Sequence, residues 1–203
     1  MTGQLVPSGS EWVLMESAGL SFRWWLLWQE RGILLPGMAA LFPALYGAGL
    51  SGAEFWSGAF FFAAMLSISV LDCRYGMIFD KVLLPLGISG LGLHCAGVLG
   101  DAGDALLGAA LGFLLLLLVR MGSRGGMGGG DVKYAAVLGA WLGWQQVLLA
   151  LFLAFLTGGM AGIGIVCHGG RDRMPFGPFL SIGAGAAFLW GASFLQWYEG
   201  YWL

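Results

Sequence analysis

The chain has 203 residues, of which 59% are apolar and only 10% are charged, and its formal net charge is −2. Soluble domains carry about a quarter charged residues, so this chain has too few charges to cover a water-facing surface. The lipid bilayer is therefore its expected solvent and partner. The charge balance offers no basic surface for nucleic acid, and the three cysteines form no CxxC pair that would indicate a zinc site or a disulfide framework.

Residues 1–31 are predicted to form an N-terminal interfacial segment ahead of a membrane-embedded domain over 32–203. The stretch EWVLMESAGLSFRWWLLWQER, residues 11–31, mixes four tryptophans with charged residues. Tryptophan favours the headgroup level, so we expect an amphipathic helix that lies in the membrane interface. A first transmembrane span is the alternative, but Glu16 and Arg23 would interrupt it.

Long charge-free stretches predict the membrane helices that follow, because a helix needs about 20 residues to cross a hydrocarbon core of about 30 Å. These stretches are 32–53, 55–71, 82–100, 105–119, 134–170 and 174–198. As one helix, 134–170 would be about 55 Å long. We therefore expect it to fold back near Gly143-Trp144-Gln145-Gln146, leaving a short fifth span over about 134–143. The sequence predicts an all-α polytopic membrane bundle of about seven transmembrane helices plus the N-terminal interfacial helix.

The distribution of charges supports this number of spans. With seven spans, all nine Lys and Arg residues fall on the same side as the N-terminus. With six spans, Arg171 and Arg173 would be stranded on the other side. The opposite side then holds only acidic charges, which are Glu54, Asp101, Asp104 and Glu199. The positive-inside rule makes the basic side cytoplasmic.

Two aspartates are predicted to share this cytoplasmic face. Asp72 ends the second span and Asp131 begins the fifth, and the chain crosses the membrane out and back between them. Each residue alone could simply be hydrated at the membrane boundary. Two carboxyls close together share a proton, so one can take a proton from water while the other polarises a peptide carbonyl, as in aspartic proteases. His94 and His168 are expected to be packing or interfacial residues.

A glycine run leads directly into the second aspartate. The sequence GGMGGGD, residues 125–131, places five glycines before Asp131. A flexible connecting loop is one interpretation. The other is that Gly128 to Gly130 adopt backbone conformations closed to other residues and let a substrate backbone approach closely. On that interpretation, the glycine turn delivers Asp131 toward a second carboxylate.

These residues resemble a known family. Gly128-Gly129-Gly130-Asp131 matches the GxGD signature of membrane-embedded aspartyl proteases, and the longer string GMGGGDVKYAAVLGAWLGWQ, residues 126–145, resembles bacterial type IV prepilin peptidases. MPFGPFLSIGA (174–184) and DCRYGMIFD (72–80) resemble them too. In the latter stretch, Phe79 replaces the family's proline, which is expected to loosen the following turn. The resemblance covers about 65–195, most of the predicted membrane core.

The resemblance implies roles for individual residues. Asp72 and Asp131 would be the catalytic pair, with Gly128 and Gly130 as signature glycines. Motif positions with supporting roles are Arg74, Asp80 and Lys133. Of these, Asp80 is expected to begin the helix of the third span. The two basic residues are expected either to interact with nearby carboxylates or to act as ordinary cytoplasmic anchors.

By resemblance, the chain is a leader peptidase of the bacterial inner membrane with its active site at the cytoplasmic face. Its substrates would be prepilins or pseudopilins whose short basic leader is removed by cleavage after a glycine. Bifunctional family members carry paired CxxC motifs linked to N-methylation of the pilin. The chain has no CxxC, so methylation, zinc and S-adenosylmethionine are not expected, and no cofactor is predicted. The sequence makes no prediction of oligomeric state.

Three other functions are compatible with two acidic residues in a membrane bundle. A proton-coupled transporter or channel would place its carboxylates at mid-bilayer depth rather than at span ends. A catalytically inactive scaffold of a pilus or secretion assembly would bind prepilin without cutting it. An intramembrane protease of signal-peptide or presenilin type would cut within the substrate's span, and the MPFGPFL stretch favours the prepilin type over it.

Overall fold

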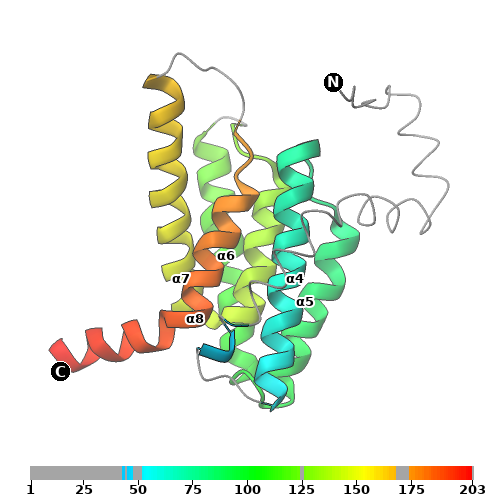
Figure 1. Ribbon diagram of the computed structural model, residues 1–203, viewed down its shortest axis with the longest axis vertical. Coiled ribbons are helices and arrows are strands. Elements are labelled where there is room, and N and C mark those ends of the chain that lie inside the picture. The colour runs from blue at the N-terminus through cyan, green and yellow to red at the C-terminus, as the bar shows by residue number, and fades with distance from the viewer. Residues whose placement is uncertain (1–42, 44, 48–51, 124–125, 168–173, 203) are drawn as a thin grey trace.

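The structure, a computed structural model, describes residues 43, 45–47, 52–123, 126–167 and 174–202. Apart from short connections, this part of the chain is helical, and Figure 1 shows most of the helices packed side by side as a bundle. The helices are α4 (Gly52–Tyr75), α5 (Asp80–Cys95), α6 (Ala102–Gly122), α7 (Gly129–Cys167) and α8 (Gly177–Trp202). The prediction of an all-α fold is confirmed.

Four of the described helices, α4, α6, α7 and α8, are long and apolar enough to cross a membrane. The chain is therefore a multi-pass membrane protein. The helix α5 has 16 residues, somewhat fewer than the roughly 20 of a full crossing. The predicted interfacial helix over 11–31 and most of the predicted span over 32–53 lie outside the described residues. The total of seven spans and the domain division at residue 31 therefore stay predictions.

The long apolar stretch of α7 folds back at Gly143, as the sequence predicts. Gly143 has φ 76° and ψ 177°, a conformation nearly restricted to glycine, and it joins two helices. Asp104, at the start of α6, lies against Gly143 and accepts a hydrogen bond from the Trp144 N–H at 3.4 Å. By Gly158 the chain has returned to Phe176, just before α8. Figure 1 shows the second part of α7, drawn in gold, running back along the bundle.

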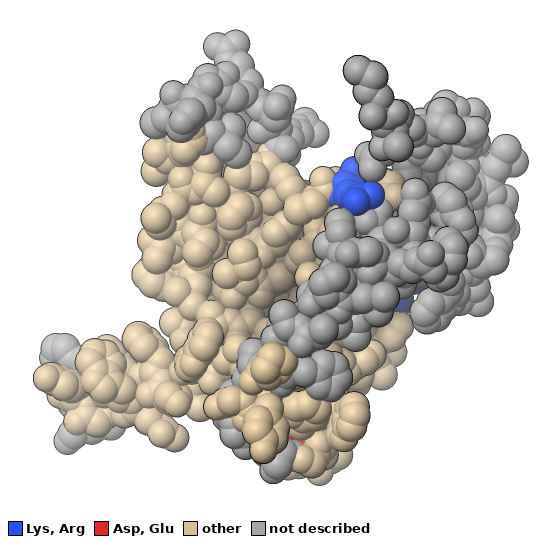
Figure 2. All heavy atoms as spheres, in the orientation of Figure 1, with Lys and Arg blue, Asp and Glu red and all other residues tan. Residues whose placement is uncertain are grey.

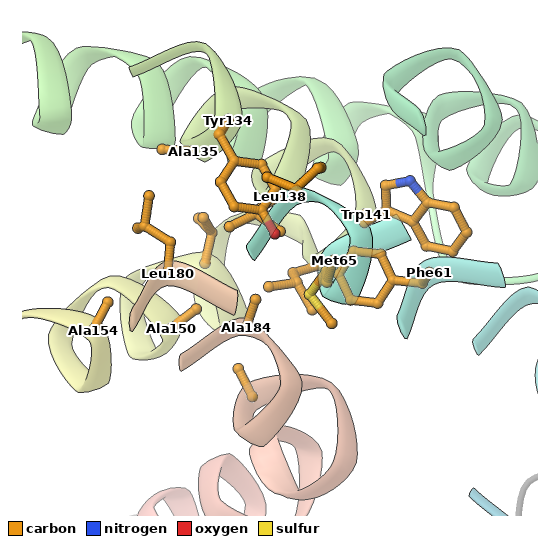
Figure 3. Close-up of a cluster of buried hydrophobic side chains, with 14 of the residues drawn as sticks. Phe61, Met65, Tyr134, Ala135, Leu138, Trp141, Ala150, Ala154, Leu180 and Ala184 are labelled. Atoms are coloured by element: carbon orange, nitrogen blue, oxygen red, sulfur yellow. The ribbon is translucent and has the colours of Figure 1, made fainter. Parts of the chain in front are cut away.

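Close contacts hold the first part of α7 in the middle of the bundle. A Cβ atom at Gly139 would collide with the backbone of Gly108 in α6, so only small residues allow this approach. On the other side, Trp141 stacks on Phe61 of α4 with ring centroids 4.7 Å apart, and its Nε1 donates to the Leu86 carbonyl of α5 at 2.6 Å. Figure 3 shows this buried cluster. The helix α7 thus contacts α4, α5 and α6 at once.

Charged residues divide between the two ends of the bundle. The last turns of α4 and α6 and the first turns of α5 and α7 form one end, and the first turns of α4 and α6 form the other. The described basic residues at the first end are Arg74, Lys81, Arg120 and Lys133, and the acidic residues at the second are Glu54, Asp101 and Asp104. Figure 2 shows one side of the molecule, which is almost uncharged among the described residues. The predicted charge asymmetry thus agrees with the fold.

The helix α8 covers most of the predicted span over 174–198, but it bends toward its C-terminal end. Figure 1 shows this part, drawn in red, running away from the bundle at a steep angle to the other helices. Near the end of α8, Trp197 and Tyr201 are 61% and 77% exposed. Tryptophan and tyrosine favour the membrane–water interface. The predicted span over 174–198 is present as a helix that is long and apolar enough to cross a membrane over Gly177–Tyr198, and the bend near its end was not predicted.

Candidate active site

Asp72 lies in the last turn of α4 with only 6% of its surface exposed. Its Oδ2 accepts a hydrogen bond from the backbone N–H of Gly177 at 2.8 Å. Gly177 is the first residue of α8, where the backbone N–H groups have no partner within their own helix. A carboxylate is therefore a suitable partner for this helix start, and it is favoured further by the helix dipole.

Asp131 lies in the first turn of α7. It is the third residue of that helix and is 8% exposed. Its carboxyl accepts a hydrogen bond from the Gly128 backbone N–H and interacts electrostatically with Asp72. Among the described residues, Asp72 and Asp131 are the two buried carboxyls. Two helices whose ends meet thus bring together two acidic side chains that lie 59 positions apart in the numbering of the chain.

The glycines before Asp131 have a steric role, because none of the described ones has a positive φ. The expectation that Gly128 to Gly130 need conformations closed to other residues is therefore wrong. A Cβ atom at Gly130 would lie 2.9 Å from the Ile78 Cβ, and one at Gly128 would lie 3.1 Å from Asp131 Oδ2. A Cβ atom at Gly129 would meet the Arg120 guanidinium, a flexible side-chain end that would have to move aside. The backbone of Gly128 to Gly130 is thus approached closely by three groups. These are the connection between α4 and α5, the end of α6 and the Asp131 carboxyl.

The supporting motif residues lie at the rim of this site. Lys133 Nζ donates to Asp80 Oδ2 at 2.7 Å, and both side chains are more than half exposed. Lys133 therefore pairs with a carboxylate, as one of the two expectations held, and that carboxylate is Asp80. Asp80 begins α5, which confirms its expected place. Arg74 is exposed in the last turn of α4.

Phe79, which stands where the family has proline, caps the start of α5. Its φ is −85° and its ψ is 122°, so its backbone is extended and within about 20° of the φ that proline imposes. Its carbonyl accepts hydrogen bonds from the Val82 and Leu83 N–H groups at 3.0 and 3.3 Å. Phe79 therefore forms the extended residue and the helix-starting hydrogen bonds without a proline ring, and a loosened turn stays a prediction.

The histidines and cysteines are the remaining candidate ligands or nucleophiles of the sequence. His94 is 3% exposed, and its Nδ1 is 3.0 Å from the Gly90 carbonyl oxygen, which confirms the expected packing role. His168 lies outside the described residues. Cys73 and Cys95 are exposed free thiols. Among the described residues, no group of three or more His, Cys, Asp or Glu side chains is placed to hold a metal ion.

Sequence reasoning missed two parts of the site. One is the Gly177 N–H that holds Asp72, although the MPFGPFL stretch that contains Gly177 stood out as a motif. The other is a hydroxyl cluster beneath the aspartates, made by Ser69, Tyr134 and Ser181. Tyr134 and Ser181 lie within the stretches 126–145 and 174–184 that resemble the family. Their contact could still not be predicted, because each hydroxyl lies on a different helix and the contacts form only in the folded bundle.

Comparison with known proteins identifies the family. The model of the type IV leader peptidase family matches residues 59–163, which include both aspartates. A prepilin leader peptidase/N-methyltransferase of Aeromonas hydrophila is 37% identical over 142 residues, covering 66% of this chain and 49% of the relative. One of the same name from Burkholderia pseudomallei (strain 1026b) is 35% identical over 198 residues, covering 93% of this chain and 57% of the relative.

The chain spans about half the length of the curated relatives it matches. No solved structure shows significant similarity to it. The family match covers more than half of the chain and contains α4 from residue 59, α5, α6 and α7 up to residue 163, so it includes the helices that carry the two buried carboxyls. The chain belongs to the type IV leader peptidase family.

Proposed function

We propose that the chain is a membrane aspartyl endopeptidase that removes the short basic leader of type IV prepilins or pseudopilins by cleavage after a glycine. The observation that carries this proposal is the pairing of Asp72 and Asp131, the two buried carboxyls of the described chain, at one end of the bundle. The relatives' names give the substrate class. Of the two activities in the relatives' names, we propose only the leader peptidase activity for this chain.

Hydrolysis needs a group that takes a proton and a group that gives one. Neighbouring carboxyls that share a single proton supply both at one pH. The ionised aspartate removes a proton from water while the water oxygen attacks the carbonyl carbon of that glycine. The protonated aspartate donates a hydrogen bond to the carbonyl oxygen, and a proton then passes to the leaving amide nitrogen as the peptide bond breaks.

The depth of the pair favours cleavage at the membrane surface. Asp72 is in the last turn of α4 and Asp131 in the first turn of α7, so both lie at helix ends. A proton-coupled transporter or channel would instead place its acidic groups near mid-bilayer depth. A prepilin has its leader outside the hydrophobic helix, so the bond to be cut lies at this level. The depth of the aspartate pair in the membrane therefore matches the position of the bond to be cut in the prepilin.

The face of the membrane follows from the charges. The described basic residues gather at the end of the bundle that holds the aspartates, and basic loops stay in the cytoplasm. We therefore assign the site to the cytoplasmic face of the bacterial inner membrane. The hydrophobic helix of the prepilin would lie in the bilayer beside the enzyme, with the leader on the cytoplasmic side.

A cleavage assay tests the proposed function. The full chain in lipid nanodiscs is mixed with a prepilin that has a Gly-Phe junction, and the products are identified by mass spectrometry. We expect release of the leader with a single cut after the glycine. The Aeromonas hydrophila relative serves as positive control. Intact prepilin in the presence of this chain, with cleavage by the relative, would leave an inactive scaffold as the better account.

Gly177→Ala should slow cleavage without unfolding the chain. An alanine Cβ would lie 2.6 Å from Asp72 Oδ2 and 3.1 Å from its Cγ, so the carboxyl must move. Small displacements of a reacting group can cost up to about 100-fold in rate, and we expect kcat to fall about 10- to 100-fold. The measurement is kcat for prepilin cleavage together with the melting temperature.

The matched control is Gly200→Ala on the same helix, where an added Cβ meets nothing within 4 Å. Its kcat and melting temperature should equal those of the wild type. Equal activity of Gly177→Ala and Gly200→Ala would show that the contact between Gly177 and Asp72 does not matter for cleavage.

A further inference from the structure

Three hydroxyl groups meet inside the bundle, one from each of three helices. Ser69 of α4 and Ser181 of α8 have their Oγ atoms 2.7 Å apart, and the Tyr134 hydroxyl of α7 is 2.8 Å from the same Ser181 Oγ. Tyr134 is fully buried, and Figure 3 shows it within the buried cluster. Polar groups in such a place weaken a core unless they are hydrogen-bonded. Their presence therefore calls for an explanation other than packing.

Each hydroxyl residue lies one helical turn deeper in the bundle than a residue of the candidate active site. Ser69 comes three positions before Asp72 on α4, and Tyr134 comes three positions after Asp131 on α7. On α8, Ser181 comes four positions after Gly177. Residues three or four apart lie on the same face of a helix. The hydroxyl cluster is therefore a second layer directly beneath the aspartate pair.

The hydrogen bonds of this layer lead to Asp72. Among the described residues, Ser181 is the hydrogen-bond partner of the Tyr134 hydroxyl, so we assign Tyr134 as the donor. The Ser181 hydroxyl is then free to donate to the Gly177 carbonyl at 3.0 Å. Gly177 in turn donates its N–H to Asp72 Oδ2 at 2.8 Å. The cluster thus fixes the first turn of α8, and that turn holds the carboxyl.

The third hydroxyl fixes this turn of α8 relative to α4, the helix that carries Asp72. Ser69 Oγ can donate to the Met65 carbonyl of its own helix or to Ser181, each at close distance. Ser181 Oγ is also 3.4 Å from the Met65 carbonyl oxygen. Helices in a lipid bilayer pack by shape and by interhelical hydrogen bonds, because the hydrophobic effect does not drive them together there. The hydroxyl cluster, which is shared by α4, α7 and α8, therefore fixes the positions of these helices relative to one another.

We propose that Ser69, Tyr134 and Ser181 are positioning residues for peptide cleavage, which hold Asp72 toward Asp131 through the first turn of α8. They do not touch the substrate. The proposal rests on the proposed function of the aspartate pair. Because the cluster acts on the geometry of the reacting groups, its loss should lower kcat and leave KM nearly unchanged.

The experiment measures kcat, KM and melting temperature for Tyr134→Phe, Ser181→Ala and the double variant, with a prepilin substrate in nanodiscs. Each single variant should lose about 10-fold in kcat, the effect of roughly one hydrogen bond, with KM within about twofold. The double variant should be no slower than the slower single variant, because both changes break the same chain of contacts. Ser181→Thr keeps a hydroxyl and should retain most of the activity.

Ser67→Ala is the matched control. The Ser67 hydroxyl donates to the Ala63 carbonyl of its own helix at 2.8 Å and lies two positions from Ser69. Its kcat should equal the wild-type value. Ser69→Ala gives a further test of the cluster if the Tyr134 variant accumulates poorly, and its kcat should also fall.

The outcomes separate this proposal from the proposed function. A wild-type chain that does not cut prepilin overturns both. A wild-type chain that cuts, with unchanged kcat in Tyr134→Phe and Ser181→Ala, overturns the positioning role alone. A fall in kcat that is equal in Ser67→Ala, or that is multiplicative in the double variant, also contradicts it.

Discussion

Replacing either Asp72 or Asp131 with asparagine will reduce prepilin cleavage at least about 1,000-fold, because each carboxyl has a separate proton-transfer role in the proposed reaction and general acid–base catalysis contributes about 100- to 10,000-fold. Asparagine has nearly the same shape as aspartate. Its amide oxygen can still accept the hydrogen bond from the Gly177 N–H in place of Asp72. The protein should therefore stay folded and inserted. The measurement is kcat/KM for leader release by Asp72→Asn and by Asp131→Asn.

The control for this result is Glu54→Gln, which makes the same chemical change at an exposed position in the first turn of α4, at the opposite end of the bundle. Its activity and its amount in the membrane should equal those of the wild type. Retention of cleavage by both asparagine variants would contradict the catalytic assignment. Loss of cleavage together with loss of protein from the membrane would contradict the expectation that the asparagine variants stay folded.

The second large effect concerns the contact between α6 and the first part of α7. Gly139→Val should destabilise the bundle by at least about 3 kcal/mol, because overpacking a buried contact costs about 1–3 kcal/mol even where side chains can shift. Here the added Cβ meets the backbone of Gly108 and lies 2.7 Å from the Ala109 nitrogen. A destabilisation of this size lowers the melting temperature of a chain of this length by about 10 °C.

Thermal unfolding in nanodiscs measures this loss of stability. Gly159→Val is the matched control, because it lies in the second part of the same helix and an added Cβ there meets nothing within 4 Å. The control should melt within about 2 °C of the wild type. If Gly139→Val also melted within that range, α6 and α7 would not be packed backbone to backbone as described.

Hydrophobicity alone predicts much of this fold. The charge-free stretches over 55–71, 82–100 and 105–119 correspond to α4, α5 and α6. The helices extend past the apolar stretches where polar residues start or end them, as Asp101 does by accepting a hydrogen bond from the Gly103 N–H. The length of the apolar stretch 134–170 predicts the reversal in α7, because a single helix of 37 residues would be longer than the bilayer is thick.

Features that depend on tertiary contacts could not be predicted in this way. The bend of α8 could not be predicted, because its stretch 174–198 reads as one continuous apolar span. The steric role of the glycines before Asp131 depends on Ile78 and Arg120, which reach them from other helices and connections. Asp104 was predicted only as an acidic residue on one face, yet its carboxylate meets the reversal at Gly143 and Trp144.

In the candidate active site, too, some features could be predicted from the sequence and others depend on tertiary contacts. Parity of the spans predicts that Asp72 and Asp131 share one face, and both are buried at the same end of the bundle. Their partner Gly177 lies 105 positions away from Asp72, and Ser181 lies 112 positions from Ser69. No local spacing encodes such contacts. The motif stretches 174–184 and 126–145 contain Gly177, Ser181 and Tyr134, but nothing in the sequence indicates that these residues contact one another or Ser69.

The measurement that tests the central claim most directly is the separation of the Asp72 and Asp131 carboxyl carbons in an experimental structure of the full chain in lipid nanodiscs. The account predicts a separation of less than about 6 Å, at which two carboxyls interact strongly enough to share a proton. A separation of more than about 10 Å would contradict it, if it is found both with and without a bound prepilin peptide. At that distance, exposed charges interact little at ordinary ionic strength.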